Sequence, residues 1–109
     1  MEHPTPIRPE EHATWSSEKM AKGTLYRSEH ILVGLNAFEP GQEHKIHAHK
    51  GMDKVYQVVH GTGVFLLEDR EELMEPGMML VAPEGVPHGV RNTGDERLLL
   101  VAILTPAPG

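Results

Sequence analysis

From Thr24 onward the chain is a series of short β-rich runs, and this feature limits the fold more than any other. Turns that combine glycine with proline or polar residues separate the runs, as in Glu39-Pro-Gly and Asn92-Thr-Gly-Asp. Many short strands with such turns between them are typical of an antiparallel sandwich or barrel. We therefore predict an all-β domain. The expected strands are Leu25–Arg27, Ile31–Phe38, Val55–Val59, Val64–Leu67, Met78–Val81 and Leu98–Leu104.

The first 23 residues have a different character. Three prolines within the first nine residues favour an extended arm, because proline lacks a backbone donor and disfavours helix at the residue before it. Trp15–Gly23 is predicted as a short helix, with Ser16 or Ser17 as the N-cap and its final glycine as the C-terminal cap. We expect residues 1–23 to form an arm and a short helix, and residues 24–109 to form a single barrel domain.

Composition excludes several classes of function. The formal net charge is -6 and the ten basic residues are dispersed, which argues against a nucleic-acid partner or an anionic membrane surface. No cysteine is present, so disulfides and thiolate metal sites are excluded, whereas eight histidines are many for 109 residues. The chain has neither a signal-peptide pattern nor an apolar run long enough for a membrane span, so we expect a cytoplasmic protein.

Two segments bring histidines into metal-ligand spacing. His47 and His49 are two residues apart and would point to one face if both lay on a strand. Further on, a predicted strand runs into a turn that contains Pro83 and Gly85, and the chain returns with His88 early on the next strand. Such a hairpin can bring a third imidazole to the first two. Neutral imidazole suits zinc, copper, iron or nickel.

These two segments resemble the two conserved motifs of the cupin family. The residues that match are Gly41, His47, His49 and Gly61 in the first motif, and Gly77, Pro83, Gly85, His88 and Asn92 in the second. The resemblance covers about Leu25 to Leu104. It implies a double-stranded β-helix, or jelly-roll, barrel that holds one divalent metal ion on the three histidines. The ion could be Fe, Mn, Zn, Ni or Cu. Turns and positive-φ positions are sufficient to explain the glycines, Pro83 and Asn92.

One position departs from the family pattern. Where the first cupin motif has a metal-binding glutamate, this chain has Lys54. A lysine cation has no lone pair and cannot act as a ligand. Asp53 is the neighbouring carboxylate, but a one-residue shift turns a strand side chain to the opposite face, so it could bind only through a bulge. A three-histidine site, a site with Asp53 or another side chain as fourth ligand, and a barrel without a functional metal remain open.

The resemblance also bears on function. Three neutral ligands would leave coordination positions for water, dioxygen or a chelating anion. This is similar to the cupin dioxygenases that use three histidines, and it implies a small-molecule enzyme with an anionic, chelating ligand. Tyr56 has the same strand parity as Lys54 and should point inward, so both are candidate catalytic residues that could stabilise charge on oxygen. The alternatives are a metal-dependent isomerase or decarboxylase, a non-catalytic small-ligand or carbohydrate-binding cupin, and for Tyr56 a role as a core aromatic.

Two runs are apolar on both faces, namely Val55–Val59 and Leu98–Leu104. A strand that is apolar on both sides is covered on both sides, and in a small domain a second subunit supplies that cover most easily. We therefore predict a homodimer.

The other histidines are interpreted as surface or hydrogen-bonded residues: His3, His12, His30 and His60. His44 lies an odd number of strand positions before His47 and is predicted to face outward.

Overall fold

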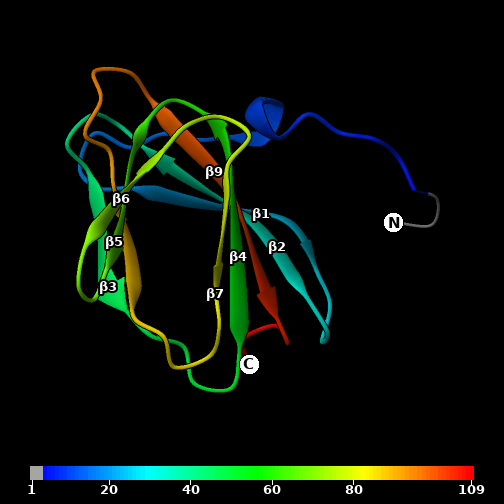
Figure 1. The fold of residues 1–109 in the computed structure, drawn as a ribbon. Coiled ribbons are helices and arrows are strands. Elements are labelled where there is room, and N and C mark those ends of the chain that lie inside the picture. Colours follow the sequence, from blue (N-terminus) through cyan, green and yellow to red (C-terminus); the bar gives the residue numbers. More distant parts are fainter. Residues whose placement is uncertain (1–3) are drawn as a thin grey trace.

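The computed structural model describes residues 4–109 and consists of two antiparallel β-sheets that face each other (Figure 1). In that part of the chain there is one 3-10 turn, η1 (Pro9–His12), and no longer helix. The strands are β1 (Ala21–Arg27), β2 (Leu32–Phe38), β3 (Glu43–His47), β4 (Asp53–His60), β5 (Gly63–Leu67), β6 (Glu71–Met74), β7 (Met79–Ala82), β8 (His88–Arg91) and β9 (Leu98–Thr105). No described helix is long and apolar enough to cross a membrane.

The strands alternate between the sheets. One sheet has the order β1-β2-β9-β4-β7 and the other has the order β3-β8-β5-β6. Because the chain changes sheet at most of its turns, strands far apart in sequence pair, as in β2 with β9 through Phe38 and Leu98. This is the double-stranded β-helix that the sequence predicted.

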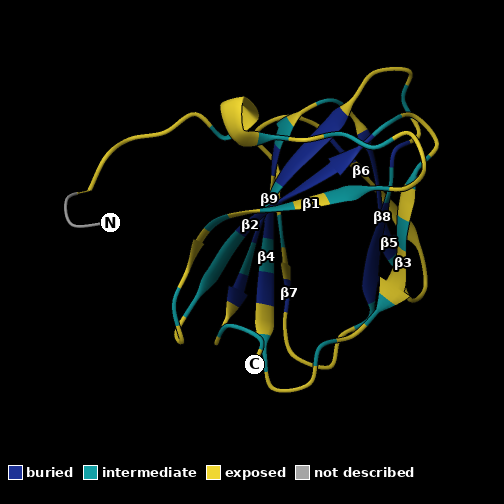
Figure 2. Cartoon of the chain, turned by 180° about the vertical axis from the view of Figure 1, so that it is seen from behind, coloured by how far each residue is buried: buried dark blue, intermediate teal, exposed yellow. Residues whose placement is uncertain are grey.

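Apolar side chains fill one end of the barrel. The buried cluster consists of Phe38, Tyr56, Val58, Phe65, Met74, Val90, Leu98, Leu100 and Ala102. These residues alternate with outward-facing positions along their strands, as the period of two requires. In Figure 2, β5 and β9 are dark blue over much of their length, whereas the N-terminal segment and many loops are yellow.

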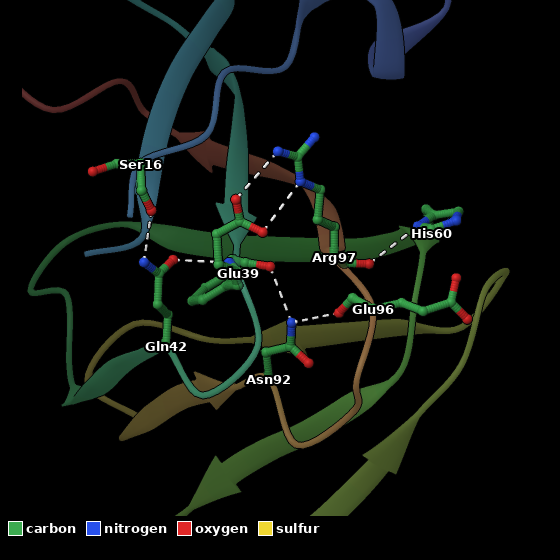
Figure 3. Close-up of polar contacts among 8 residues, drawn as sticks. Ser16, Glu39, Gln42, His60, Asn92, Glu96 and Arg97 are labelled. Carbon is green, nitrogen blue, oxygen red and sulfur yellow. Dashed lines mark hydrogen bonds and ion pairs between the residues drawn. The ribbon is translucent and has the colours of Figure 1, made fainter. Parts of the chain in front are cut away.

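A polar network fastens the loops at this packed end (Figure 3). The Asn92 amide donates to the carbonyls of Phe38 and Glu96 at 3.0 and 2.9 Å, and its oxygen accepts from the Gly94 N–H at 3.0 Å. Arg97 donates to both carboxylate oxygens of Glu39. Asn92 therefore has the structural role that the sequence predicted.

The predicted helix Trp15–Gly23 is wrong. Ser16 accepts the Glu18 N–H at 3.2 Å, a local bond that closes a bend rather than capping a helix, and β1 already begins at Ala21. Trp15 packs on the outer face of the five-stranded sheet and lies 4.7 Å from the Arg97 guanidinium. Tertiary packing thus outweighed a two-turn helix, which is marginal by itself.

This packing also changes the interpretation of the two-sided strands. Part of the outer face of β9 is covered by the chain's own N-terminal segment, because Ala13 and Trp15 pack with Leu35 and Leu99. A second subunit is therefore not needed for that part of the sheet.

Candidate metal centre

Three histidines converge at the end of the barrel opposite the packed cluster. His47 ends β3 and pairs in register with His88, which begins β8. His49 follows in the loop before β4. Each of the three offers a ring nitrogen, and these atoms all lie within 4.8 Å of one another. The ring centroid of His47 lies 4.8 Å from that of His49 and 4.4 Å from that of His88.

The cluster forms for a different reason than the one predicted. His49 is not on a strand, because β3 ends at His47 and the chain turns at Gly51, which has a φ of 76°. The His49 carbonyl accepts the N–H of Gly85 at 2.9 Å, which joins the β3–β4 loop to the turn before His88. Contact between two loops, rather than alternation along one strand, brings the His49 ring to its partners.

In His47 and His88, the hydrogen bonds made by Nδ1 leave Nε2 available to bind a metal ion. Nδ1 of His47 lies 2.7 Å from the Lys45 carbonyl, and Nδ1 of His88 lies 2.9 Å from the Val86 carbonyl. Because a carbonyl oxygen only accepts, Nδ1 carries the proton in both rings and Nε2 keeps its lone pair. The Nε2 atoms of His47, His49 and His88 are all buried without a hydrogen-bond partner among the described residues. Three unpartnered Nε2 atoms in one cluster, two of which keep their lone pairs through the Nδ1 hydrogen bonds, fit a divalent metal ion.

The surroundings keep these rings neutral. Burial lowers the pKa of His47, His49 and His88 below the ordinary 6.5, and for His49 the pKa falls to about 4. The nearby Lys54 charge acts in the same direction on all three. The neutral imidazole that binds metals is therefore the dominant form at neutral pH.

His44 does not face outward, so that prediction is wrong. Between the pairs His44–Val90 and His47–His88, two residues of β3 oppose the single residue Gly89 of β8. This bulge reverses the parity, and the His44 ring stacks on that of His47 with centroids 4.2 Å apart. Its Nδ1 is buried without a partner among the described residues, and burial lowers its pKa to about 3. It lies beside the three-histidine group rather than within it.

Gly89 permits the bulge. A Cβ atom at this position would lie 2.7 Å from the His44 carbonyl oxygen and 2.9 Å from the Ile46 nitrogen. The missing side chain therefore lets β3 approach β8 closely. A glycine inside a strand, directly after a candidate ligand, was the signal that could have revealed the placement of His44.

Lys54 and Tyr56 both point inward from β4, but Asp53 does not. Lys54 is only 4% exposed and its ammonium lies 4.6 Å from the Tyr56 ring centroid. Burial, followed by the charge of Lys22, lowers the pKa of Lys54 from 10.5 to about 8. The Tyr56 hydroxyl has no partner among the described residues, and burial raises its pKa well above the ordinary value. The Tyr56 and His88 ring centroids are 5.9 Å apart.

Asp53 lies on the outer side of β4. Its carboxylate accepts the Glu84 N–H at 3.0 Å, and the described pairing of β4 with β9 shows no bulge at this residue. The interpretation of Asp53 as fourth ligand is therefore wrong, because without a bulge the strand parity directs its side chain away from the histidines.

A cavity of about 240 Å³ adjoins the cluster. Its polar lining comes from Lys22, Thr24, Asn36, His44, His47, His49 and Lys54. No aspartate or glutamate of residues 4–109 lines it. Sequence reasoning missed Lys22, which was assigned to the end of a helix, and Asn36, which was hidden in an apolar run.

The remaining described histidines lie away from this cavity. His12 is in η1, His30 is paired with Glu29, and His60 contacts the Arg97 carbonyl at 3.1 Å. His3 lies outside the described residues.

The fold and the site define a double-stranded β-helix with a histidine cluster inside the barrel. The Cupin domain family matches residues 34–104, well over half of the chain, and the chain therefore belongs to this family.

Similar proteins support the same conclusion. The crystal structure of TT1209 from Thermus thermophilus is 41% identical, with a TM-score of 0.89 over 94% of this chain and 98% of that one. An RmlC-like cupin from Desulfovibrio desulfuricans is 26% identical, with a TM-score of 0.82 over 95% of this chain and 98% of that one. An oxalate-binding protein of Thermotoga maritima is 28% identical over 85 residues, which cover 78% of this chain and 69% of that protein.

Proposed function

We propose that this cupin binds one divalent metal ion through His47, His49 and His88 and uses it to hold a small, chelating, anionic ligand. The observation that carries the proposal is the set of three buried Nε2 atoms that lack partners within residues 4–109. When bound, the ion would supply a Lewis acid and a template for ligand oxygen atoms. The resemblance to an oxalate-binding protein supports an anionic ligand of this kind.

A dioxygenase-type enzyme is the second candidate. It is supported by the three neutral ligands, which leave coordination positions open, and by Tyr56, whose hydroxyl is buried and whose ring centroid lies 5.9 Å from that of His88. Tyr56 and Lys54 would then be the catalytic residues, donating hydrogen bonds to charge that develops on ligand oxygen. An isomerase or a decarboxylase could use the same two side chains without dioxygen.

Metal analysis tests the first part of the proposal. Protein purified without nickel chromatography should contain one equivalent of a divalent metal or take it up in a calorimetric titration. His88→Ala should weaken that binding by at least about 100-fold, because the loss of a ligand exceeds the 10–100-fold effect of losing a supporting residue. His30→Ala, at an exposed histidine, is the matched control. Unchanged binding in folded His88→Ala protein would contradict the assignment.

Turnover separates binding from catalysis. Protein reconstituted anaerobically with iron(II) should be screened for oxygen uptake with enolate and catechol-like anions, and for anaerobic loss of the same substrates. Thermal stabilisation by oxalate that requires metal, without consumption of the ligand, would support a binding protein. Oxygen uptake that depends on both metal and Tyr56 would instead support the enzyme.

We also propose a homodimer formed through the outer face of the five-stranded sheet. Val33, Ile103, Val55 and Val81 are cross-strand neighbours in one row over β2, β9, β4 and β7. In the single chain Val81 is 60% exposed and the adjacent Met79 is 58% exposed. Because a contiguous apolar row needs cover, a second copy is the occupant that would extend it symmetrically.

Light scattering at micromolar concentration should therefore give twice the monomer mass. Val81→Lys should shift the protein toward monomer, whereas Val86→Lys, at an exposed valine outside the row, should not. A monomeric wild type would refute the dimer.

A further inference from the structure

Two lysines face the cavity beside the histidine cluster, from two strands of the five-stranded sheet that are separated by β2 and β9. Lys54 comes from β4 and Lys22 from the edge strand β1. The contact recorded for the Lys54 ammonium among the described residues is the Tyr56 ring, and no carboxylate pairs with it. A cation that is 4% exposed and lacks an anion is costly, since burial removes its hydration without a compensating charge.

Nothing in the cavity lining offsets this charge. Two ammonium groups and three imidazoles are present, and the lining contains no acidic side chain from residues 4–109. The chain as a whole carries a net charge of -6, so the concentration of positive charge at this position opposes the overall balance. A divalent ion on the histidines would add two further positive charges. The site therefore favours a ligand that brings more negative charge than a single metal-chelating group provides.

Lys22 also connects the inside of the barrel to its surface. Lys22 and His44 line both the inner cavity and a surface groove between the start of β1 and β3. The groove also contains Lys19, Lys45 and Glu43, and the Glu43 carboxylate is already paired with Arg91. A ligand that reaches from the histidines toward the β1 edge would therefore pass the buried Lys54 and the exposed Lys22. It would then extend toward a groove in which lysines outnumber the Arg91-paired Glu43.

We infer that Lys22 and Lys54 form an anion-binding subsite, and that the ligand is a dicarboxylate with a chelating 2-hydroxy or 2-oxo acid at one end. The chelating end would lie at the histidines and the distal carboxylate at the two ammonium groups. The buried Asn36 side chain lies on the same wall, and its oxygen, which has no partner among the described residues, can accept a hydrogen bond from a ligand hydroxyl but not from a carboxylate. The inference rests on the proposed metal-dependent function and adds the residues that select the ligand.

Matched ligand pairs test the inference in metal-loaded protein. Malate and 2-hydroxybutyrate differ only in that a methyl group replaces the distal carboxylate, as do 2-oxoglutarate and 2-oxopentanoate. In calorimetry, at least one dicarboxylate should bind about ten-fold or more tightly than its partner, the effect of one charge-assisted hydrogen bond. Equal affinity within both pairs would overturn the inference.

Lysine variants test whether Lys22 and Lys54 cause the preference for a dicarboxylate. Lys54→Met and Lys22→Gln should each bring the affinity ratio within a pair close to one, while 2-hydroxybutyrate binding stays within about two-fold. Lys50→Gln, on the turn outside the cavity, should leave the ratio unchanged. Because Lys22 is exposed, Lys22→Gln carries the test even if Lys54→Met fails to fold. A ratio that neither variant changes would overturn the inference.

A metal titration distinguishes failure of the proposed metal-dependent function from failure of the lysine subsite. Manganese(II) alone should bind wild type, Lys22→Gln and Lys54→Met with equal stoichiometry, since neither lysine supplies a lone pair. Absence of metal binding by wild type refutes the proposed function. Normal metal binding without selectivity for dicarboxylates refutes only the lysine subsite.

Discussion

The two ends of the barrel are built from the same strands but differ in chemistry. On β4, Lys54 faces the cavity and Val58 the packed core, with Tyr56 between them. On β8, His88 belongs to the cluster and Val90 to the core. Each strand thus changes from polar to apolar within two or four residues. In this small domain, the apolar cluster at one end of the interior therefore supplies most of the packing that stabilises the fold. The other end can then hold polar groups that lack partners within the described chain.

Removing a large side chain from the packed end should give the largest change. Leu100→Ala is expected to lower the free energy of unfolding by about 2–5 kcal/mol, because it removes buried methyl groups and leaves a cavity. Urea denaturation measures this loss. If the two ends are separate in function, folded Leu100→Ala protein should still bind metal within about three-fold of wild type. A loss of metal binding in folded variant protein would break the comparison.

The free energy of unfolding should depend on pH because of Lys54, at the polar end of the barrel. Below pH 8, Lys54 is charged in both the folded and the unfolded state, so the folded state carries the full cost of the buried cation. Above pH 8 the folded state releases this proton first, the unfolded state binds more protons, and stability rises. Between pH 8 and 9.5, a pKa of about 8 against 10.5 gives a gain on the order of 1–2 kcal/mol in metal-free protein.

Urea titrations of wild type and Lys54→Met across that range measure the gain. The variant lacks the titrating group and should show a flatter profile, while Lys50→Gln should keep the wild-type slope. Parallel profiles in wild type and Lys54→Met would show that the Lys54 pKa is not lowered in the folded state.

The smallest change is expected for metal affinity at mildly acidic pH. Burial has lowered the pKa of all three ligand rings, so protons should compete with metal only well below pH 6.5. Affinity should fall far less between pH 7 and 5.5 than it would for three ordinary imidazoles, which would lose roughly several hundred-fold. Calorimetric titrations with manganese(II) at both pH values check this, and a steep loss would show that the rings are more hydrated than their burial indicates.

Local sequence patterns were sufficient to predict much of the fold and the members of the histidine cluster. Turn residues marked the strand boundaries, and Gly41, Gly61, Gly77 and Gly85 all have positive φ, as predicted. The short strand β6 was missed because its first two residues are glutamates on an exposed sheet edge, which leaves little apolar alternation to detect.

The sequence was sufficient to predict an all-β barrel from its turns and, through the resemblance of its two motifs to the cupin family, the cluster of His47, His49 and His88. The loop contact that places the His49 ring was not part of that prediction. Tertiary structure alone decided that Lys22 joins Lys54 at the cavity and that His44 turns inward. Both depend on contacts between segments distant in sequence. Lys22 reaches the cavity through the pairing of β1 with β2, and the β3 bulge follows from the close approach of Gly89 on β8. Counting alternate residues along one strand predicts which way a side chain points, but it cannot predict contacts with other strands.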